Sequence, residues 1–173
     1  MSTRSSPALK LVRDPASVLF ICTGNICRSP TAAGVFARYV SDAGLEQRIR
    51  VASAGTHGYH VGERADPRTL EAALRRGYDF SEHRARLFAA RDFQAFDVLL
   101  AMDEGHLAHM ANLAQPSQVH KLHLMMAFAS RHPGSKSVPD PYYGGGDGFE
   151  RVLDMLEDAA AGLLAQMGEQ LGY

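Results

Sequence analysis

Short apolar runs alternate along this chain with longer segments in which apolar residues recur every three or four positions. Residues 18–21, Val-Leu-Phe-Ile, lead directly into Cys-Thr-Gly-Asn. This pattern is typical of a strand that is buried on both faces and ends in a tight loop. Similar runs predict three more strands, at residues 50–54, 97–102 and 121–125.

The segments between these runs have helical spacing. Pro30 suits the first turn of a helix that Gly44 ends. Asp66 suits the N-cap position of a second helix, which Gly77 ends. The same spacing predicts two further helices, at residues 103–113 and from residue 149 to about residue 171.

Strands that alternate with helices predict an α/β fold: a three-layer open sheet of four parallel strands, flanked by helices on both faces. Ligands of such sheets bind at the carboxyl ends of the strands, where the strand order reverses, so the loop after the first strand is the first candidate site. We expect residues 1–16 to form a flexible N-terminal tail and residues 17–173 a single domain. Residues 57–65 and 130–148 are irregular, and such stretches are often functional.

Composition narrows the class of protein. The 173 residues carry 18 Lys and Arg against 19 Asp and Glu, a net charge of -1, which argues against a charge-driven nucleic-acid binder. No apolar run approaches the roughly 18 residues of a membrane span, and the N-terminus lacks a secretion signal. We expect a soluble cytoplasmic protein, with export by a signal-free route left open. Cys22 and Cys27 are too few to staple the fold with disulfides.

The segment from Cys22 to Arg28 has the composition of an anion-binding loop. Gly24 and Asn25 tolerate backbone angles that turn successive N–H groups toward one point, and the following helix start adds positive potential there. A cysteine at that focus is stabilised as its thiolate, with help from Arg28 and the Ser29 hydroxyl. Arg28 also presents a planar fork of donors that can hold two oxygens of a phosphoryl group.

Taken singly, each of these features has an ordinary structural explanation: a buried cysteine at a strand end, a glycine in a turn, an arginine at the surface. Together they occur in the one order that phosphate chemistry requires: strand, nucleophile, glycine-bearing loop, arginine and helix start. The loop therefore predicts attack on a phosphoryl group by Cys22.

The residues VLFICTGNICRSPTAAGVF, which begin at Val18, resemble the signature of the low-molecular-weight protein tyrosine phosphatases. Later family segments resemble VASAGTHGYHVGERADPRT, GYDFSEHRAR, FDVLLAMDEGHL and VPDPYYGGGDGFE. The resemblance implies hydrolysis of phosphotyrosine in proteins, through a phosphocysteine intermediate on Cys22 and with Arg28 binding the phosphoryl group. It also implies no metal and no cofactor, a tyrosine-phosphorylated protein as substrate, and inorganic phosphate as product.

Asp140 is the candidate proton donor for the leaving oxygen, since a phenol with a pKa of about 10 leaves poorly without a proton. On the residues alone, an aspartate between Pro139 and Pro141 is more often a turn former. The resemblance instead implies that Asp140 is the general acid of the first step and the base that deprotonates water in the second.

Tyrosines in the two irregular stretches are expected to wall the substrate pocket. Tyr59, Tyr142 and Tyr143 would form a slot that lets an aryl phosphate reach the sulfur and leaves the shorter serine phosphate short of it. Many relatives carry Trp where this chain has Tyr59. That departure leaves the substrate preference open.

Further residues are expected to bind phosphate or to support the loop. Ser53 and His83 match family positions that hydrogen-bond to the asparagine of the loop. A hydroxyl at Ser29 would assist departure of the sulfur in the second step. The full expected set is Thr23, Gly24, Asn25, Ile26, Cys27, Ser29, Ser53 and His83.

Cys27 shares the loop with Cys22. The resemblance implies that Cys27 captures an oxidised Cys22 as a disulfide, so that thiols reverse inactivation by peroxide. The alternative is that Cys27 only packs.

The residues give less support to other functions. His57 with His60, and His106 with His109, have spacings that bring imidazoles together, but no zinc-binding motif accompanies them, so we expect no metal site. An arsenate reductase on the same fold needs more cysteines, and none follows Cys27. A silent phosphotyrosine-binding module needs neither nucleophile nor proton donor. We expect a monomer; a weak dimer through the tyrosine-bearing rim would block the pocket.

Overall fold

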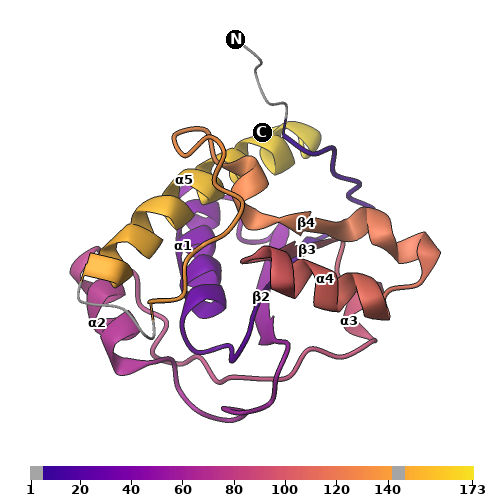
Figure 1. Ribbon diagram of the computed structural model, residues 1–173. Helices are drawn as coiled ribbons and strands as arrows, with labels where there is room; N and C mark the ends of the chain where they lie inside the picture. Colours follow the sequence, from indigo (N-terminus) through magenta and orange to yellow (C-terminus); the bar gives the residue numbers. More distant parts are fainter. Residues whose placement is uncertain (1–5, 142–146) are drawn as a thin grey trace.

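A single parallel sheet organises the chain, as the computed structural model shows for residues 6–141 and 147–173 (Figure 1). The sheet has four strands in the order β2-β1-β3-β4. They are β1 (Ala16–Cys22), β2 (Ile49–Gly55), β3 (Val98–Ala101) and β4 (Leu122–Leu124). Because β1 pairs with both β2 and β3, the strand order reverses at β1, and the carboxyl end of β1 lies at the switch point.

Helices cover both faces of the sheet (Figure 1). One face packs against α1 and α5, and the other against α3 and α4. The helices are α1 (Arg28–Asp42), α2 (Pro67–Arg75), α3 (Asp92–Ala95), α4 (Glu104–Leu113) and α5 (Asp147–Gln170), with short 3-10 helices η1 (Pro116–Lys121) and η2 (Met125–Phe128). The predicted α/β architecture of four parallel strands between helical layers is therefore confirmed.

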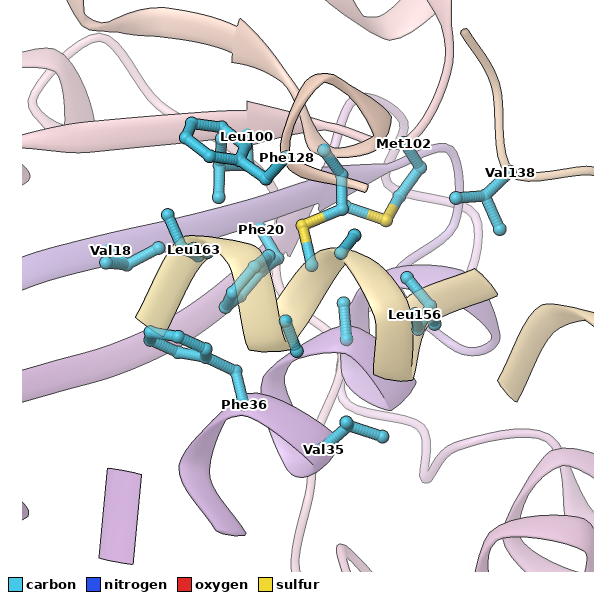
Figure 2. Packing of buried hydrophobic residues seen from close by; sticks show 14 of the residues in the cluster. Val18, Phe20, Val35, Phe36, Leu100, Met102, Phe128, Val138, Leu156 and Leu163 are labelled. Atoms are coloured by element: carbon cyan, nitrogen blue, oxygen red, sulfur yellow. The ribbon is translucent and has the colours of Figure 1, made fainter. Parts of the chain in front are cut away.

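Strand β1 is buried along its whole length because it is the central strand and has helices on both sides. Val18 and Phe20 face the α1 and α5 side, and Leu19 and Ile21 face the opposite core. The Phe20 and Phe36 rings meet edge to face with centroids 5.7 Å apart (Figure 2). Truncation of such a buried ring costs about 3–5 kcal/mol, so this packing holds the end of β1 in place.

The element ends differ slightly from the predicted ones. Helix α1 begins at Arg28 and has Pro30 in its first turn, as predicted, but the predicted strand at residues 97–102 is regular only over Val98–Ala101. The sequence pattern did not reveal α3, η1 or η2, because one or two turns are too short to display a helical period. None of these differences moves the carboxyl end of β1.

Residues 6–15 contain no helix or strand but contact the folded body. The Arg13 guanidinium lies 3.1 Å from an Asp97 carboxylate oxygen, and Gln170 of α5 donates a hydrogen bond to the Leu9 carbonyl at 3.0 Å. Ala16, assigned above to the tail, is the first residue of β1 and fully buried. The flexibility expected of residues 1–16 stays a prediction.

Among the helices of residues 6–141 and 147–173, none is both long enough and apolar enough to span a bilayer.

Candidate active site

The loop between β1 and α1 is held by the side chain of Asn25. This residue has φ 59°, the one positive φ among the non-glycine residues that the structure describes, and it is fully buried. Its amide nitrogen donates to the hydroxyls of Ser29 at 2.8 Å and Ser53 at 3.0 Å, and its amide oxygen accepts from the Arg86 backbone N–H at 3.0 Å. The His83 ring nitrogen Nε2 lies 2.7 Å from the Asn25 carbonyl oxygen. These contacts offset the cost of the left-handed conformation.

His83 is neutral in this position. Burial lowers the pKa of His83, so the neutral tautomer with a proton on Nε2 donates to the Asn25 carbonyl. Ser53 and His83 thus occupy the places expected for them beside Asn25, with His83 on its backbone carbonyl rather than its amide group.

The carbonyl groups at the start of the loop point away from its centre. Thr56 N–H donates to the Cys22 carbonyl at 2.9 Å, and His57 N–H donates to the Thr23 carbonyl at 3.0 Å. A Cβ atom at Gly55 would lie only 2.7 Å from the Thr23 carbonyl oxygen, so only glycine allows this close approach. Within residues 6–141 and 147–173, the N–H groups of residues 23–27 donate no hydrogen bond. They remain available to an anion.

Cys22 lies at the base of this loop and is 3% exposed. Its sulfur is 2.9 Å from the Ser29 hydroxyl oxygen. Asn25 already donates to that oxygen, and of the two acceptors near the Ser29 hydroxyl proton, the sulfur at 2.9 Å is closer than the Ala54 carbonyl at 3.5 Å. Ser29 therefore serves as a hydrogen-bond donor to a thiolate at Cys22.

Arg28, the first residue of α1, is oriented by groups from distant parts of the chain. Its Nη1 donates to the Asp103 carboxylate at 2.8 Å and to the Val138 carbonyl at 3.1 Å, while Nη2 lies 3.7 Å from an Asp140 carboxylate oxygen. Val138 N–H in turn donates to the Met102 carbonyl at 2.7 Å, just beyond β3, and the two side chains share one cluster (Figure 2). Arg28 is thus fixed with Nη2 beside the carboxylate of Asp140.

Asp103 remains ionised beside Arg28. Burial favours its neutral form, but the His106 backbone N–H and the hydrogen bond and charge of Arg28 outweigh burial and hold the pKa of Asp103 below its usual range. A permanent carboxylate at this position keeps the guanidinium aligned.

The loop, Arg28 and Asp140 enclose one cavity of about 180 Å³. Asp140 reaches it from a segment that is bounded by Pro139 and Pro141, and 39% of its side chain is exposed. Tyr59 stands at the rim, 73% exposed, with its ring stacked on His57 at 5.2 Å. The cavity is lined by Cys22, Thr23, Gly24, Ile26, Cys27, Arg28, Tyr59, His60 and Asp140.

Tyr142 and Tyr143 lie outside the described residues. Cys22 and Cys27 are both free thiols, and burial, together with the nearby negative charges of Asp66 and Asp140, raises the pKa of Cys27 to about 12. Cys27 therefore remains protonated at neutral pH.

Sequence reasoning missed the groups that align Arg28. In the sequence, Asp103 indicates only a helix start, which it also is, since its carboxylate accepts from the His106 N–H at 2.8 Å. The spacing of His106 and His109 suggests only a metal pair, but the His106 ring faces Thr23 instead. Neither a local motif nor a spacing reveals these contacts, because Asp103 and Val138 lie 75 and 110 residues from Arg28.

In the part of the chain that the structure describes, no group of three or more His, Cys, Asp or Glu could hold a metal ion.

Comparison with known proteins agrees with this geometry. The family model for low molecular weight phosphotyrosine protein phosphatases matches residues 17–172. A low molecular weight protein-tyrosine-phosphatase of Streptomyces coelicolor is 46% identical over 156 residues, or 89% of this chain and 94% of that protein. A low molecular weight phosphotyrosine protein phosphatase of Schizosaccharomyces pombe is 44% identical over 149 residues, or 85% of this chain and 94% of that protein.

Solved structures share the fold as well. The crystal structure of a protein tyrosine phosphatase from Entamoeba histolytica, with Hepes in its active site, superposes with a TM-score of 0.87 at 36% identity. The match covers 90% of this chain and 99% of that one. The likeness therefore extends over nearly all of the chain, well beyond the loop after β1.

Proposed function

Because this chain belongs to the low molecular weight phosphotyrosine protein phosphatase family, an enzyme family that hydrolyses phosphotyrosine, we propose that Cys22, Arg28 and Asp140 carry out the reaction. One observation carries this assignment. The three side chains come from the end of β1, the start of α1 and the segment before α5, yet they line a single cavity of about 180 Å³.

In the first step, the Cys22 thiolate attacks phosphorus opposite the phenolic oxygen. A sulfur–phosphorus bond forms as the phosphorus–oxygen bond breaks, and Asp140 donates its proton to the departing oxygen. Arg28 binds two phosphoryl oxygens through its fork of donors, and the N–H groups of residues 23–27 are available for the charge that remains.

In the second step, Asp140, now a carboxylate, removes a proton from a water molecule that attacks phosphorus from the side the phenol has left. The sulfur–phosphorus bond breaks and inorganic phosphate is released. The Ser29 hydroxyl, 2.9 Å from the sulfur, stabilises the thiolate as it leaves. The enzyme returns to its starting state without a metal or cofactor.

The shape of the cavity supports an aromatic substrate. Cys22 is 3% exposed at its base, whereas Tyr59 stands 73% exposed at its rim. A phosphate must therefore extend some distance from the protein backbone that bears it, and the phenyl ring of phosphotyrosine provides that length and an apolar surface for Tyr59.

The test is hydrolysis of an aryl phosphate by the wild type and by Cys22→Ser, with acid-quench trapping of phosphoprotein. We expect phosphate on the wild-type enzyme during turnover, and neither phosphate nor turnover with Cys22→Ser. Cys27→Ser is the matched control, since Cys27 lies in the same loop and remains a thiol. Turnover by Cys22→Ser would exclude the assignment. A wild type that reduces arsenate without hydrolysing the ester would be the reductase. A wild type that binds phosphate but does neither would be a silent phosphotyrosine-binding module.

We further propose that oxidation regulates the enzyme reversibly. Peroxide oxidises the Cys22 thiolate to a sulfenic acid and is itself reduced to water; the Cys27 thiol then attacks that sulfur, and the oxygen leaves as water. Because the pKa of Cys27 is raised to about 12, capture is slow but still protects Cys22 from irreversible oxidation. Thiol reductant should restore the wild type after peroxide more completely than Cys27→Ser, and equal recovery would exclude this role.

We also propose a cellular compartment and an oligomeric state for the enzyme. A reaction that needs a reduced thiol at Cys22 fits the cytoplasm, where thiols are kept reduced. Cys22, Arg28 and Asp140 of a single chain already meet at one cavity, so we propose a catalytically competent monomer acting on tyrosine-phosphorylated proteins. Sedimentation and activity measured across a range of protein concentrations test the oligomeric state.

A further inference from the structure

A buried histidine connects two halves of the phosphate site. His106, in the first turn of α4, is 4% exposed. Its ring nitrogen Nε2 lies 2.8 Å from the Thr23 hydroxyl, in the loop after Cys22, and its other nitrogen lies 3.1 Å from Asp103. Asp103 uses its second oxygen to hold Arg28 at 2.8 Å. The polar contacts therefore run from Thr23 through His106 and Asp103 to Arg28.

The position of the proton on this ring follows from its neighbours. Nδ1 lies within 3.1 Å of the Asp103 carboxylate but at an angle too poor for a proper hydrogen bond. A lone pair on Nδ1 would face that carboxylate and repel it, so the proton resides on Nδ1. Nε2 is then an acceptor, and the Thr23 hydroxyl donates to it.

His106 is neutral while it makes these contacts. Burial and the positive charges of Arg28 and His109 lower its pKa to about 4, against the opposing charges of Asp103 and Asp140. A neutral ring keeps an acceptor for Thr23 over the whole physiological pH range, which a charged ring would lack.

We propose that His106 is a positioning residue that holds Thr23 and, through Asp103, Arg28 in the fixed relation that phosphate binding requires. The proposal rests on the roles assigned above to the loop and to Arg28. The loop N–H groups and the guanidinium must meet the same phosphoryl group from two sides, but β1 and α1 alone leave the Arg28 side chain free to rotate about its own bonds. Contacts from His106 and from Asp103 at the start of α4 remove that freedom and align the loop with the Arg28 guanidinium.

The experiment is a double-mutant cycle with Thr23→Val and His106→Phe, each of which removes one side of the hydrogen bond and preserves the approximate shape. The readouts are kcat and KM for an aryl phosphate and the inhibition constant of inorganic phosphate. Each single variant should raise KM and the phosphate inhibition constant about fivefold, with kcat changed less than about twofold, since the loss of one hydrogen bond acts on binding. The double variant should bind phosphate no more weakly than the single variant with the larger loss.

Conservative variants separate positioning from simple folding effects. Thr23→Ser keeps the hydroxyl, and His106→Gln places an amide oxygen near the position of Nε2, so both should bind phosphate within about twofold of the wild type. His123→Gln is the matched control, because His123, in β4, is another largely buried histidine but packs edge-on against Phe128 of η2.

The outcomes are distinct. Additive effects of the two substitutions, or unchanged phosphate inhibition in Thr23→Val, would overturn the proposal. If His106→Phe fails to fold, Thr23→Val with Thr23→Ser decides the question alone, because neither changes the buried ring. A wild type that neither hydrolyses aryl phosphates nor binds phosphate would instead refute the proposed function.

Discussion

The two sides of the active site are built differently. On the side of the nucleophile, Asn25 and Ser29 are fully buried, Arg28 is 5% exposed, and each makes several hydrogen bonds. On the side of the acid, the Asp140 side chain is 39% exposed, and its segment is anchored by the backbone of Val138. The contrast suits the chemistry: the phosphate must meet a preorganised site, whereas the acid must face a substrate that enters and leaves.

We therefore expect substitutions that disturb geometry to reduce activity most on the buried side, where the nucleophile and Arg28 lie. Arg28→Lys keeps the positive charge but cannot bind Asp103, Val138 and two phosphoryl oxygens at once. We expect kcat/KM for an aryl phosphate to fall by about a thousandfold and phosphate inhibition to weaken strongly. Arg38→Lys is the control, since Arg38 is half exposed and contacts Asp42 and the Gly77 carbonyl, neither of which lines the cavity. A loss of less than tenfold would contradict the preorganised role of the guanidinium.

The acid side should show a smaller effect that depends on the leaving group. Asp140→Asn should slow turnover of tyrosine phosphate by about a hundredfold, because a phenolate leaves poorly without a proton. Turnover of p-nitrophenyl phosphate, whose leaving group is much more acidic, should fall less, and phosphate should bind normally.

Parallel measurement of kcat for both substrates checks this prediction. Asp42→Asn, an exposed aspartate on α1, is a suitable control. Equal losses on the two substrates would mean that Asp140 orients the substrate rather than donating a proton.

The smallest effect concerns stability, and it belongs to the buried side. The pKa of His106 is lowered to about 4 in the folded protein from 6.5, so its neutral form favours folding. That contribution is complete above pH 6.5 and is lost as the pH falls toward 4, because the unfolded chain binds the proton first. Between pH 7 and pH 5 the free energy of unfolding should fall by about 2 kcal/mol from this group.

Urea unfolding of the wild type and His106→Gln at the two pH values measures this difference. The variant should lose less stability than the wild type between pH 7 and pH 5. Burial lowers the pKa of His123 as well, so His123→Gln, in which His106 is intact, should retain the part of the loss that comes from His106. A wild type that is as stable at pH 5 as at pH 7 would disprove the prediction.

Much of this protein follows from local sequence. The apolar run before Cys22, the glycine and asparagine of the loop, and the helix after Arg28 predicted where the sheet would present an anion site, since a parallel sheet places its ligands at strand ends. The resemblance of whole segments extended this to Ser53, His83 and Asp140, which the loop alone does not indicate. Short elements such as α3 escaped prediction because a single turn has no period to detect.

The order of the elements and the chemistry of the loop can be derived from the residues alone, because hydrophobic periodicity and the backbone preferences of glycine and asparagine are local properties. The alignment of Arg28 depends on the packed fold. Asp103 and Val138 reach it only because β3 pairs beside β1 and the chain beyond β3 passes the same edge of the sheet. Such contacts depend on strand order, and strand order is settled when the whole core packs.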